Sequence, residues 1–285
     1  MIDFQNVSFS YGEESSGGGI RNVNLTINTG EFVLLTGESG CGKTTITRLV
    51  NGLVPHYYEG KLEGDVLLDG KSVSDTPLYD LAAMVGSVFQ NPKSQFFNVD
   101  TDSELAFACE NLGYPQEDIL KRIDRTVSDY HIEDLMGRSV FALSGGEKQK
   151  IACASSSVLL PGIMVLDEPS SNLDMAAIDD LRQVLSLWKK QGKTILIAEH
   201  RLYYLHDLAD RVLYVKDGEI EREYTPAEFD SLSDGTRKEI GLRPFSLSKL
   251  KPANQYQAHT AKQMEFQNFC FAYKKREPES LHIPS

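Results

Sequence analysis

A glycine-rich segment near the N-terminus carries the clearest chemistry in this sequence. Residues 34–45 comprise an apolar strand, a G-x-x-x-x-G-K-T run and the start of a helix. Glycines let the backbone curl tightly, so that successive N–H groups point inward at phosphate oxygens. The helix that begins there adds the positive end of its dipole. The segment predicts a nucleotide phosphate site formed by Gly37, Glu38, Ser39, Gly40, Cys41, Gly42, Lys43, Thr44 and Thr45.

Three side chains of this loop have separate tasks in such a site. Lys43 is placed to reach the β- and γ-phosphates, and the Thr44 hydroxyl can ligate Mg²⁺. Thr45 is well placed for the α-phosphate. A glycine-rich turn can match the pattern by chance, but the strand before it and the helix after it favour a phosphate site.

Strand and helix patterns alternate along the first 224 residues and predict an α/β fold that positions this loop. Residues 2–11 and 22–28 alternate apolar with polar side chains, as strands with one buried face do. Continuous apolar runs, typical of strands buried on both faces, occupy residues 32–36, 163–166 and 194–198. Further strands are predicted at residues 66–68, 84–90, 212–215 and 219–224, the last two joined by a D-G turn.

Helical spacing occupies the stretch between the central strands. It extends from residue 102 to residue 136, and we place a helical subdomain at about residues 91–160. A second amphipathic helix, residues 177–190, is expected to bury Trp188 in the core. After residue 224 the pattern thins, so that residues 225–263 are predicted to form an extension of short helices and linker.

The composition limits the classes of protein to which this chain can belong. The chain has 285 residues, 41% of them hydrophobic, which is ample for a packed core, and its formal charge is −12. That charge argues against binding nucleic acid through bulk electrostatics. The four cysteines lie far apart without a C-x-x-C pair, so a reducing cytosol is expected. We see no signal peptide and no run near the ~20 apolar residues that cross a bilayer, so a membrane part would come from another chain.

An internal repeat bears on the domain organisation. Residues 264–273 match residues 2–11 position by position at an offset of 262, and five of the ten residues are identical. At that offset a second phosphate loop would begin near position 299, beyond Ser285. We therefore expect residues 264–285 to hold the first strand of a truncated second domain, although two amphipathic strands can also resemble each other by chance.

Two further motifs line up with the phosphate loop. The apolar run 163–166 ends in Asp167 and Glu168, at the end of a strand where open α/β sheets bind their ligands. Alone, this acidic pair is better explained as a solvated strand end. Residues 143–149 read L-S-G-G-E-K-Q, in which Ser144 can cap a helix whose glycines leave amides open to an anion. Together the three motifs resemble the ATPase subunit of an ATP-binding-cassette (ABC) transporter over residues 1–224.

The resemblance rests most on the family's signature motif, L-S-G-G-Q, in which Glu147 here replaces the commoner Gln. It implies a P-loop NTPase fold of the ABC ATPase type, with a mostly parallel core sheet, an N-terminal antiparallel β subdomain and an inserted α-helical subdomain. In this family the signature motif contacts nucleotide held by the other copy of a head-to-tail dimer. The truncated second copy fits that arrangement.

The resemblance also implies roles for single residues. Asp167, Thr44 and Gln90 would hold Mg²⁺, and Glu168 would polarise the water that attacks the γ-phosphate. His200 would contact the γ-phosphate, and Tyr11 would stack on adenine. Taken singly, the histidine and the tyrosine have plain structural explanations; their order around the stronger motifs favours the site. The second cassette would meet Ser144, Gly145, Gly146, Glu147 and Asp174.

The implied function is ATP hydrolysis with Mg²⁺ that powers a membrane importer from the cytoplasmic face, as a peripheral subunit. Residues 51–56, 90–95 and 199–202 look like those of the energy-coupling-factor importers, which take up vitamins and transition-metal ions. The expected partners are a second ABC ATPase domain (the chain's own second half or another copy), a transmembrane coupling subunit and a substrate-binding membrane subunit. No nucleic acid is expected.

Two other classes of protein compete with this prediction. A soluble tandem ABC ATPase acting on ribosomes or DNA also carries duplicated cassettes, but here no long charged arm follows Gln90 and residues 226–263 are not strongly basic. A regulatory nucleotide-binding module without hydrolysis is disfavoured because both carboxylates and His200 are present.

Overall fold

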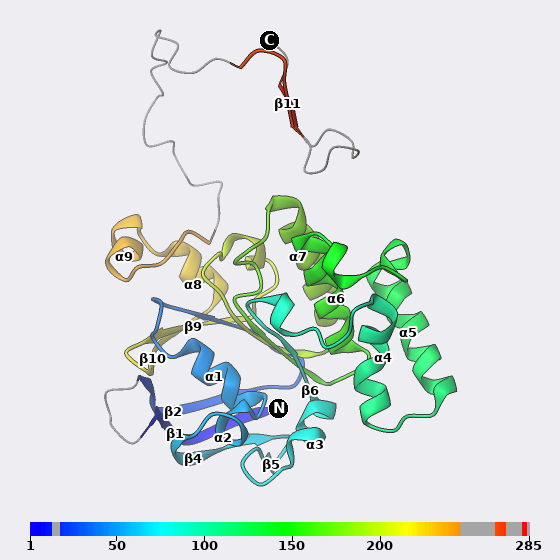
Figure 1. Cartoon of the computed structure of the whole chain (residues 1–285). Coiled ribbons are helices and arrows are strands. Elements are labelled where there is room, and N and C mark those ends of the chain that lie inside the picture. Colours follow the sequence, from blue (N-terminus) through cyan, green and yellow to red (C-terminus); the bar gives the residue numbers. More distant parts are fainter. Residues whose placement is uncertain (13–17, 246–265, 272–280, 284–285) are drawn as a thin grey trace. The chain divides into compact units, whose positions relative to one another are not determined.

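The computed structural model describes residues 1–12, 18–245, 266–271 and 281–283 (Figure 1). The chain divides into two compact units, residues 1–248 and residues 249–285. The first unit contains every predicted nucleotide motif. Within the described residues, no helix combines the length and the apolar character needed to cross a bilayer.

A six-stranded sheet forms the centre of the first unit, in the order β10-β9-β3-β8-β7-β6. Its inner strands are parallel to one another, and β10 pairs with β9 in the antiparallel sense. Every residue of β3 and β8 is buried, as expected for apolar runs covered on both faces. The strands are β3 (Phe32–Thr36), β6 (Val85–Val88), β7 (Ile163–Asp167), β8 (Thr194–Ala198), β9 (Arg211–Lys216) and β10 (Glu219–Tyr224).

A smaller antiparallel sheet forms from the N-terminal part of the chain, in the order β2-β1-β4-β5. Its strands are β1 (Ile2–Tyr11), β2 (Gly19–Ile27), β4 (Gly60–Leu68) and β5 (Lys71–Ser72). Alternate side chains of β2 are buried, which is the pattern that the sequence predicts for a strand with one covered face. The mostly parallel core sheet and the antiparallel subdomain are both confirmed.

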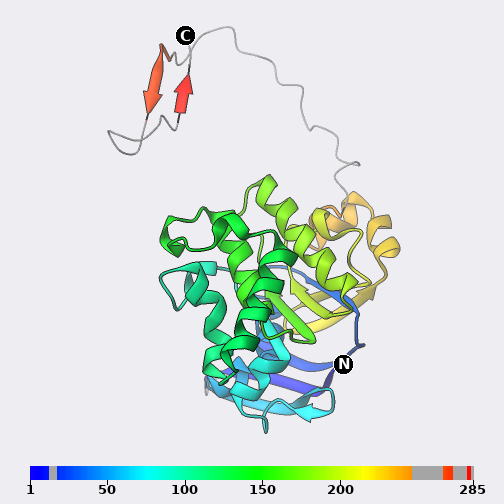
Figure 2. The same cartoon turned by 90° about the vertical axis from the view of Figure 1, so that its right-hand side faces the viewer.

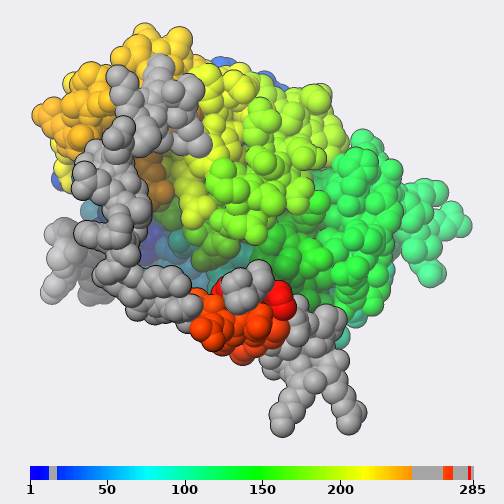
Figure 3. All heavy atoms as spheres, turned by 90° about the horizontal axis from the view of Figure 1, so that it is seen from above, coloured from blue at the N-terminus to red at the C-terminus, as the bar shows by residue number. Residues whose placement is uncertain are grey.

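Helices cover the core sheet and build the helical subdomain. Short helices follow the strands of the nucleotide-binding part: α1 (Lys43–Val50), α2 (Leu53–His56) and α3 (Leu78–Met84). The green helices of Figures 1 and 2 gather on one side of the unit, and their atoms form one end of the surface in Figure 3. They are α4 (Thr101–Asn111), α5 (Gln116–Tyr130) and α6 (Gly145–Ser157), next to α7 (Met175–Lys190) and the 3₁₀ turns η1 (Pro92–Ser94), η2 (Glu133–Leu135), η3 (Val140–Ala142) and η4 (Tyr203–Leu205).

The core sheet separates two hydrophobic clusters. Phe32 and Leu34 of β3 belong to the cluster that contains α6, α7 and the helical subdomain. Val33 and Leu35 belong to the other cluster, together with α1 and the antiparallel sheet. Successive side chains of a strand point to opposite faces, so one short strand contributes to both cores. This arrangement fixes the end of β3, where the phosphate loop begins.

The segment after β10 packs onto the first unit. It forms α8 (Pro226–Ser231) and α9 (Asp234–Glu239), and the side chains of Phe229 and Phe245 are fully buried. The Tyr214 hydroxyl of β9 donates a hydrogen bond to the carbonyl of Ile240 (3.3 Å). The predicted extension therefore begins as a packed part of the unit (orange in Figure 3).

In the second unit, β11 (Phe269–Phe271) pairs with β12 (Leu281–Ile283) in the antiparallel sense. The predicted first strand of a second domain, residues 264–273, lies partly outside the described residues. The domain boundaries proposed from the sequence repeat stay a prediction.

Three helices are joined by one buried chain of hydrogen bonds. Trp188 of α7 is fully buried, as predicted, and its Nε1–H donates to the hydroxyl of Tyr130 at the end of α5. That hydroxyl donates in turn to Ser157 Oγ of α6 at 2.5 Å. Burial raises the pKa of Tyr130 above its ordinary range, so the phenol remains a donor throughout the physiological range.

We expect Tyr130→Phe to destabilise the first unit by about 1–3 kcal/mol, because it leaves a buried indole N–H without an acceptor and a buried serine without its donor. Urea unfolding measures the change. The matched control is Tyr79→Phe, whose ring is 64% exposed, and it should stay within ~0.5 kcal/mol of wild type. Equal stability of the two variants would show that the hydrogen-bond chain contributes little.

Candidate active site

The phosphate loop connects β3 to α1 and depends on glycine at two positions. Gly37 has φ 148°, and a Cβ there would lie 2.1 Å from the carbonyl oxygen of Val215. Gly42 has φ 111°, and a Cβ there would lie 2.9 Å from Ile20. Gly42 is also the left-handed residue from which α1 starts. Larger residues are therefore excluded by contact as well as by backbone conformation.

Lys43 turns back into this loop. Its side chain is only 4% exposed, and Nζ donates to the carbonyl oxygens of Gly37 (3.0 Å) and Glu38 (2.7 Å). Nζ also lies 3.6 Å from Cys41 Sγ. To bind a triphosphate, the ammonium group would exchange these neutral acceptors for charged oxygens, which form stronger hydrogen bonds.

Thr44 and Asp167 contact each other at one edge of the core sheet, where β8 lies between the strands that precede them. The Thr44 hydroxyl donates to Asp167 Oδ1 at 3.1 Å. Burial raises the pKa of Asp167; the Thr44 hydrogen bond opposes that shift, and the nearby charge of Glu168 adds to it. Two hard oxygen donors in one desolvated place fit the ligand preference of Mg²⁺.

Glu168 lies at the centre of a three-residue contact. Its Oε2 accepts a hydrogen bond from Gln90 Nε2 (3.1 Å), and its Oε1 lies 3.1 Å from His200 Nε2. The backbone of Glu168 is left-handed (φ 45°), an uncommon conformation for a glutamate, and its N–H donates to the carbonyl of Ala198 (2.8 Å). Residues that follow β6, β7 and β8 thus come together in the structure.

Tyr11 is held on the side of α1 by two polar contacts. Its hydroxyl lies 3.2 Å from Thr45 Oγ1 and accepts a hydrogen bond from Arg48 Nη1 (3.0 Å). The Arg48 guanidinium also stacks over the Tyr58 ring, 4.1 Å from its centroid. The sequence prediction omitted Arg48 and Tyr58. The position of Arg48 on the amphipathic helix that follows the loop was the available signal for this contact. An arginine at such a position usually faces solvent.

The signature segment forms a complete helix cap. The Ser144 side chain accepts from the N–H of Glu147 (3.3 Å), and Glu147 Oε2 accepts from the N–H of Ser144 (2.7 Å). These bonds to Ser144 lower the pKa of Glu147, whose Oε1 also lies 3.6 Å from Arg138. Glu147 therefore has a structural task that the sequence motif alone did not show: it closes a capping box.

The signature segment lies apart from the phosphate loop. Together with Gly145, Gly146 and Glu147, Ser144 lines a cavity of about 410 Å³ whose other wall includes Asn172 and Asp174. The Asp174 side chain caps α7 by accepting from the N–H of Ala177 (2.9 Å). None of the residues lining this cavity belongs to residues 37–45.

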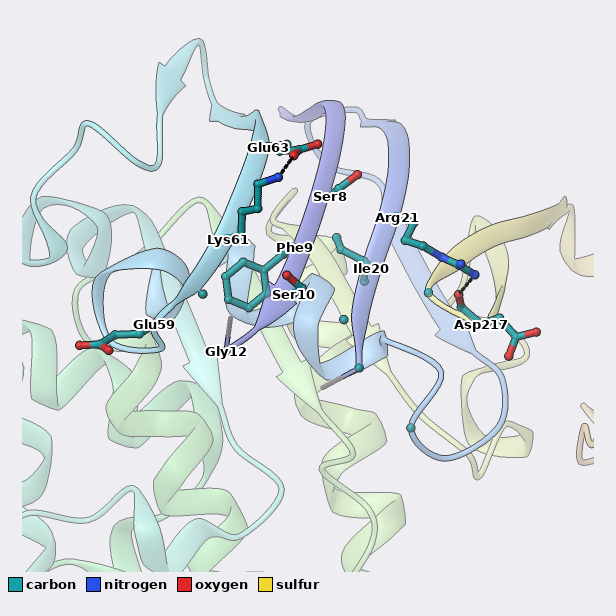
Figure 4. A pocket seen from close by; sticks show the side chains of 15 residues that line it. Ser8, Phe9, Ser10, Gly12, Ile20, Arg21, Glu59, Lys61, Glu63 and Asp217 are labelled. Carbon is teal, nitrogen blue, oxygen red and sulfur yellow. Dashed lines mark hydrogen bonds and ion pairs between the residues drawn. The ribbon is translucent and has the colours of Figure 1, made fainter. Parts of the chain in front are cut away.

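Two more cavities are lined by residues of the first unit. One of about 480 Å³ is lined by Asp167 and Gln90 together with Arg48, Tyr57 and Tyr58. The other, of about 1220 Å³, touches the loop only at Gly40 and extends over β1, β2 and β4. Figure 4 shows this second cavity with the ion pair Lys61–Glu63 and with Arg21 bonded to the Asp217 carbonyl. Neither Asp167 nor Glu168 lines it.

A family model described as ABC transporter matches residues 20–171. An ABC transporter ATP-binding protein of Treponema denticola is 46% identical over 251 residues, covering 88% of this chain and 51% of that protein. One of Pyrococcus abyssi is 40% identical over 245 residues, covering 85% of this chain and 86% of that protein. The chain belongs to the ABC transporter family. It spans about half the length of the Treponema relatives that it matches.

Solved structures of the same family share this fold. The structure of cbiO1 from Clostridium perfringens, part of the ABC transporter complex cbiONQ, has a TM-score of 0.71 and 27% identity, covering 83% of this chain and 93% of that one. The ATP-binding cassette MJ0796, a dimer in a post-hydrolysis state with ADP and Pi, has a TM-score of 0.68 and 26% identity, covering 79% and 99%. The predicted ABC ATPase fold is confirmed.

We expect Asp167→Asn to raise the melting temperature at neutral pH when Mg²⁺ and nucleotide are left out. Because burial raises the pKa of Asp167, the folded protein loses stability as the pH rises above the ordinary carboxyl value of 3.8, and Asp167→Asn removes that loss. Each 1 kcal/mol of penalty that is removed raises Tm by about 2–4 °C in a domain of this size.

Thermal unfolding monitored by circular dichroism checks this, and the gain should vanish when the pH falls below the ordinary carboxyl value. Asp75→Asn, at an exposed position, is the control and should leave Tm unchanged at both pH values. A lower Tm for Asp167→Asn at neutral pH would contradict the proposed penalty.

Proposed function

We propose that this chain binds ATP with Mg²⁺ and hydrolyses it at the ends of β3, β6, β7 and β8. The observation that carries the proposal is the joint arrangement of Thr44 with Asp167 and of Gln90 with Glu168 and His200. Parallel strands present their carboxyl ends at one edge of the sheet, and that edge is where ligands of open α/β sheets bind.

Each residue has a task in phosphoryl transfer to water. Amides of residues 37–45 and Nζ of Lys43 would bind the β- and γ-phosphates. Thr44, Asp167 and Gln90 would hold Mg²⁺, which neutralises charge on the phosphate oxygens. Glu168 would accept the proton of the attacking water, and His200 would stabilise the transferring phosphoryl group.

Two cassettes are needed in this proposal, because the signature segment does not line the same cavities as the phosphate loop. Residues Ser144 to Glu147 present an N-terminal helix end, which binds anions well. In a head-to-tail pair they would meet the γ-phosphate held by the other cassette, and Asp174 would lie at the same seam. The dimeric structure of the cassette MJ0796 supports the pairing of two cassettes. The second cassette would be another copy or a following part of the same protein.

We further propose that the pair powers a membrane importer of the energy-coupling-factor type, for a vitamin or a metal ion, from the cytoplasmic face. A transmembrane coupling subunit would dock at the 480 Å³ groove next to Gln90, where the Tyr57 ring is 70% exposed. A substrate-binding membrane subunit would complete the assembly. The likeness to cbiO1, part of a cbiONQ complex, supports this choice.

Glu168→Gln should retain ATP binding and lose turnover by about 10²–10⁴-fold, the usual contribution of a positioned general base. Steady-state phosphate release gives the rate, and titration with a fluorescent ATP analogue gives the affinity. Lys43→Ala is the contrasting variant: it should weaken binding itself, since it removes the cation that contacts the phosphates. Normal turnover by Glu168→Gln would disprove the assignment of the base.

Tyr57→Ala should reduce recovery of membrane subunits in detergent extracts by about tenfold, because exposed aromatics in a groove often dominate an interface. ATP affinity should stay unchanged. Tyr79→Ala is the matched control, since that ring is 64% exposed but does not line the groove. Recovery of ribosomal RNA in place of membrane proteins would favour the ribosome-associated class.

A further inference from the structure

One buried carboxylate beside the site has no task in the proposed reaction. Glu199 directly follows β8 and directly precedes His200, and it is only 1% exposed. Burying an ionised carboxylate is costly unless donors surround it. Among the ion pairs of the described residues, none includes Glu199. Its charge must therefore be compensated by hydrogen bonds.

Four donors surround the two oxygens of Glu199, two on each. Oε1 accepts the N–H groups of His200 (2.7 Å) and Arg201 (3.0 Å), which follow it in the chain. Oε2 accepts the N–H of Ser170 (3.3 Å) and the hydroxyl of Tyr204 (2.8 Å). Burial raises the pKa of Tyr204 well above its ordinary value, so this hydroxyl keeps its proton.

The two oxygens reach two different loops. Oε1 fixes the backbone of His200, whose side chain contacts Glu168. Oε2 fixes the backbone of Ser170, two residues beyond Glu168, and Ser170 is fully buried. A second link runs the same way, because Arg201 Nη1 donates to the carbonyl of Leu173 (2.9 Å).

We propose that Glu199 is a positioning residue that keeps His200 and Glu168 in register, and that it joins the loop after β8 to the loop after β7. Glu199 lines none of the three cavities described above. One carboxylate holds both loops, so a shift of His200 would move the 170–174 segment, which leads to Asp174 at the proposed seam between cassettes. This inference rests on the proposed ATPase function and concerns regulation of the same site.

The substitution Glu199→Gln distinguishes the hydrogen bonds to the loop after β8 from those to the loop after β7. A glutamine oxygen can still accept from His200 and Arg201, and its NH₂ group can donate to Tyr204, since a hydroxyl also accepts. Its NH₂ group cannot accept from Ser170. The variant should therefore keep the loop after β8 in place and release the loop after β7, with little change in overall shape.

We expect Glu199→Gln in the intact transporter assembly to lower kcat by about 10–100-fold, as small misplacements of reacting groups do, with KM for ATP within about twofold of wild type. A double-mutant cycle with His200→Ala should be non-additive, because both changes disturb the same arrangement. A merely structural role predicts additive losses that follow Tm.

The matched control is Glu104→Gln. Glu104 is also a buried glutamate (4% exposed) that accepts backbone N–H groups, from Phe97 (3.0 Å) and Asn98 (2.9 Å), but it lies on α4 away from the carboxylates of the site. It should lose stability without losing kcat. A wild-type kcat for Glu199→Gln, or equal loss in both variants, would overturn the inference.

Amide hydrogen exchange distinguishes failure of this inference from failure of the proposed function. Glu199→Gln should speed exchange at Ser170 by at least about tenfold and leave His200 and Arg201 protected, whether or not ATP is hydrolysed. Unchanged protection at Ser170 overturns the inference. If the wild-type protein shows no ATP hydrolysis that Glu168→Gln abolishes, the proposed function is wrong instead.

Discussion

The register of three parallel strands determines the geometry of this site. Leu35 of β3 pairs with Ala198 of β8, and Ala198 pairs with Asp167 of β7. The phosphate loop, the loop with His200 and the acidic pair therefore leave the sheet at one level. A slip by one residue would turn alternate side chains to the opposite face, so the buried apolar runs on both faces hold the register. The Thr44–Asp167 hydrogen bond across β8 is the local result.

Charge at this site is balanced without a strong positive field from the rest of the chain, whose formal charge is −12. Backbone amides, the start of α1 and Lys43 offer the attraction for an anion. Asp167 and Glu168 oppose it. Burial is the main cause of the raised pKa of Asp167, and the neighbouring charge of Glu168 adds to it. A divalent cation would relieve the repulsion between these two carboxylates, since they would become ligands or neighbours of a positive charge.

Much of this fold is predictable from sequence because the buried strands are short uninterrupted apolar runs. Residues 32–36 and 194–198 have the same bounds in the sequence prediction and in the structure. The β4 strand begins at Gly60, earlier than the predicted residues 66–68, because its first half is polar and exposed and is held by pairing with β1. The packing of the segment after β10 was also hard to predict, because it depends on two isolated phenylalanines that belong to no periodic apolar pattern.

The parts of the site that lie within one sequence motif were predictable, and the contacts between separate loops were less so. Side-chain identity places Lys43 and Thr44, and the pairing of Glu168 with Gln90 and His200 follows from strand order. Contacts such as Arg48 with Tyr11, or Glu199 with Ser170, join residues 37 and 29 positions apart and have no local spacing that reveals them. Glu147 is a case of its own, because the residue was recognised but its bond to Ser144 was not.

The capping box of α6 has a thermodynamic consequence for assembly. Helix nucleation is unfavourable because several dihedral angles are fixed for the first hydrogen bond. Ser144 and Glu147 already meet that requirement within a single chain, with each accepting the backbone N–H of the other. In the proposed pair of cassettes, none of the free energy of association would then be spent on folding the start of this helix.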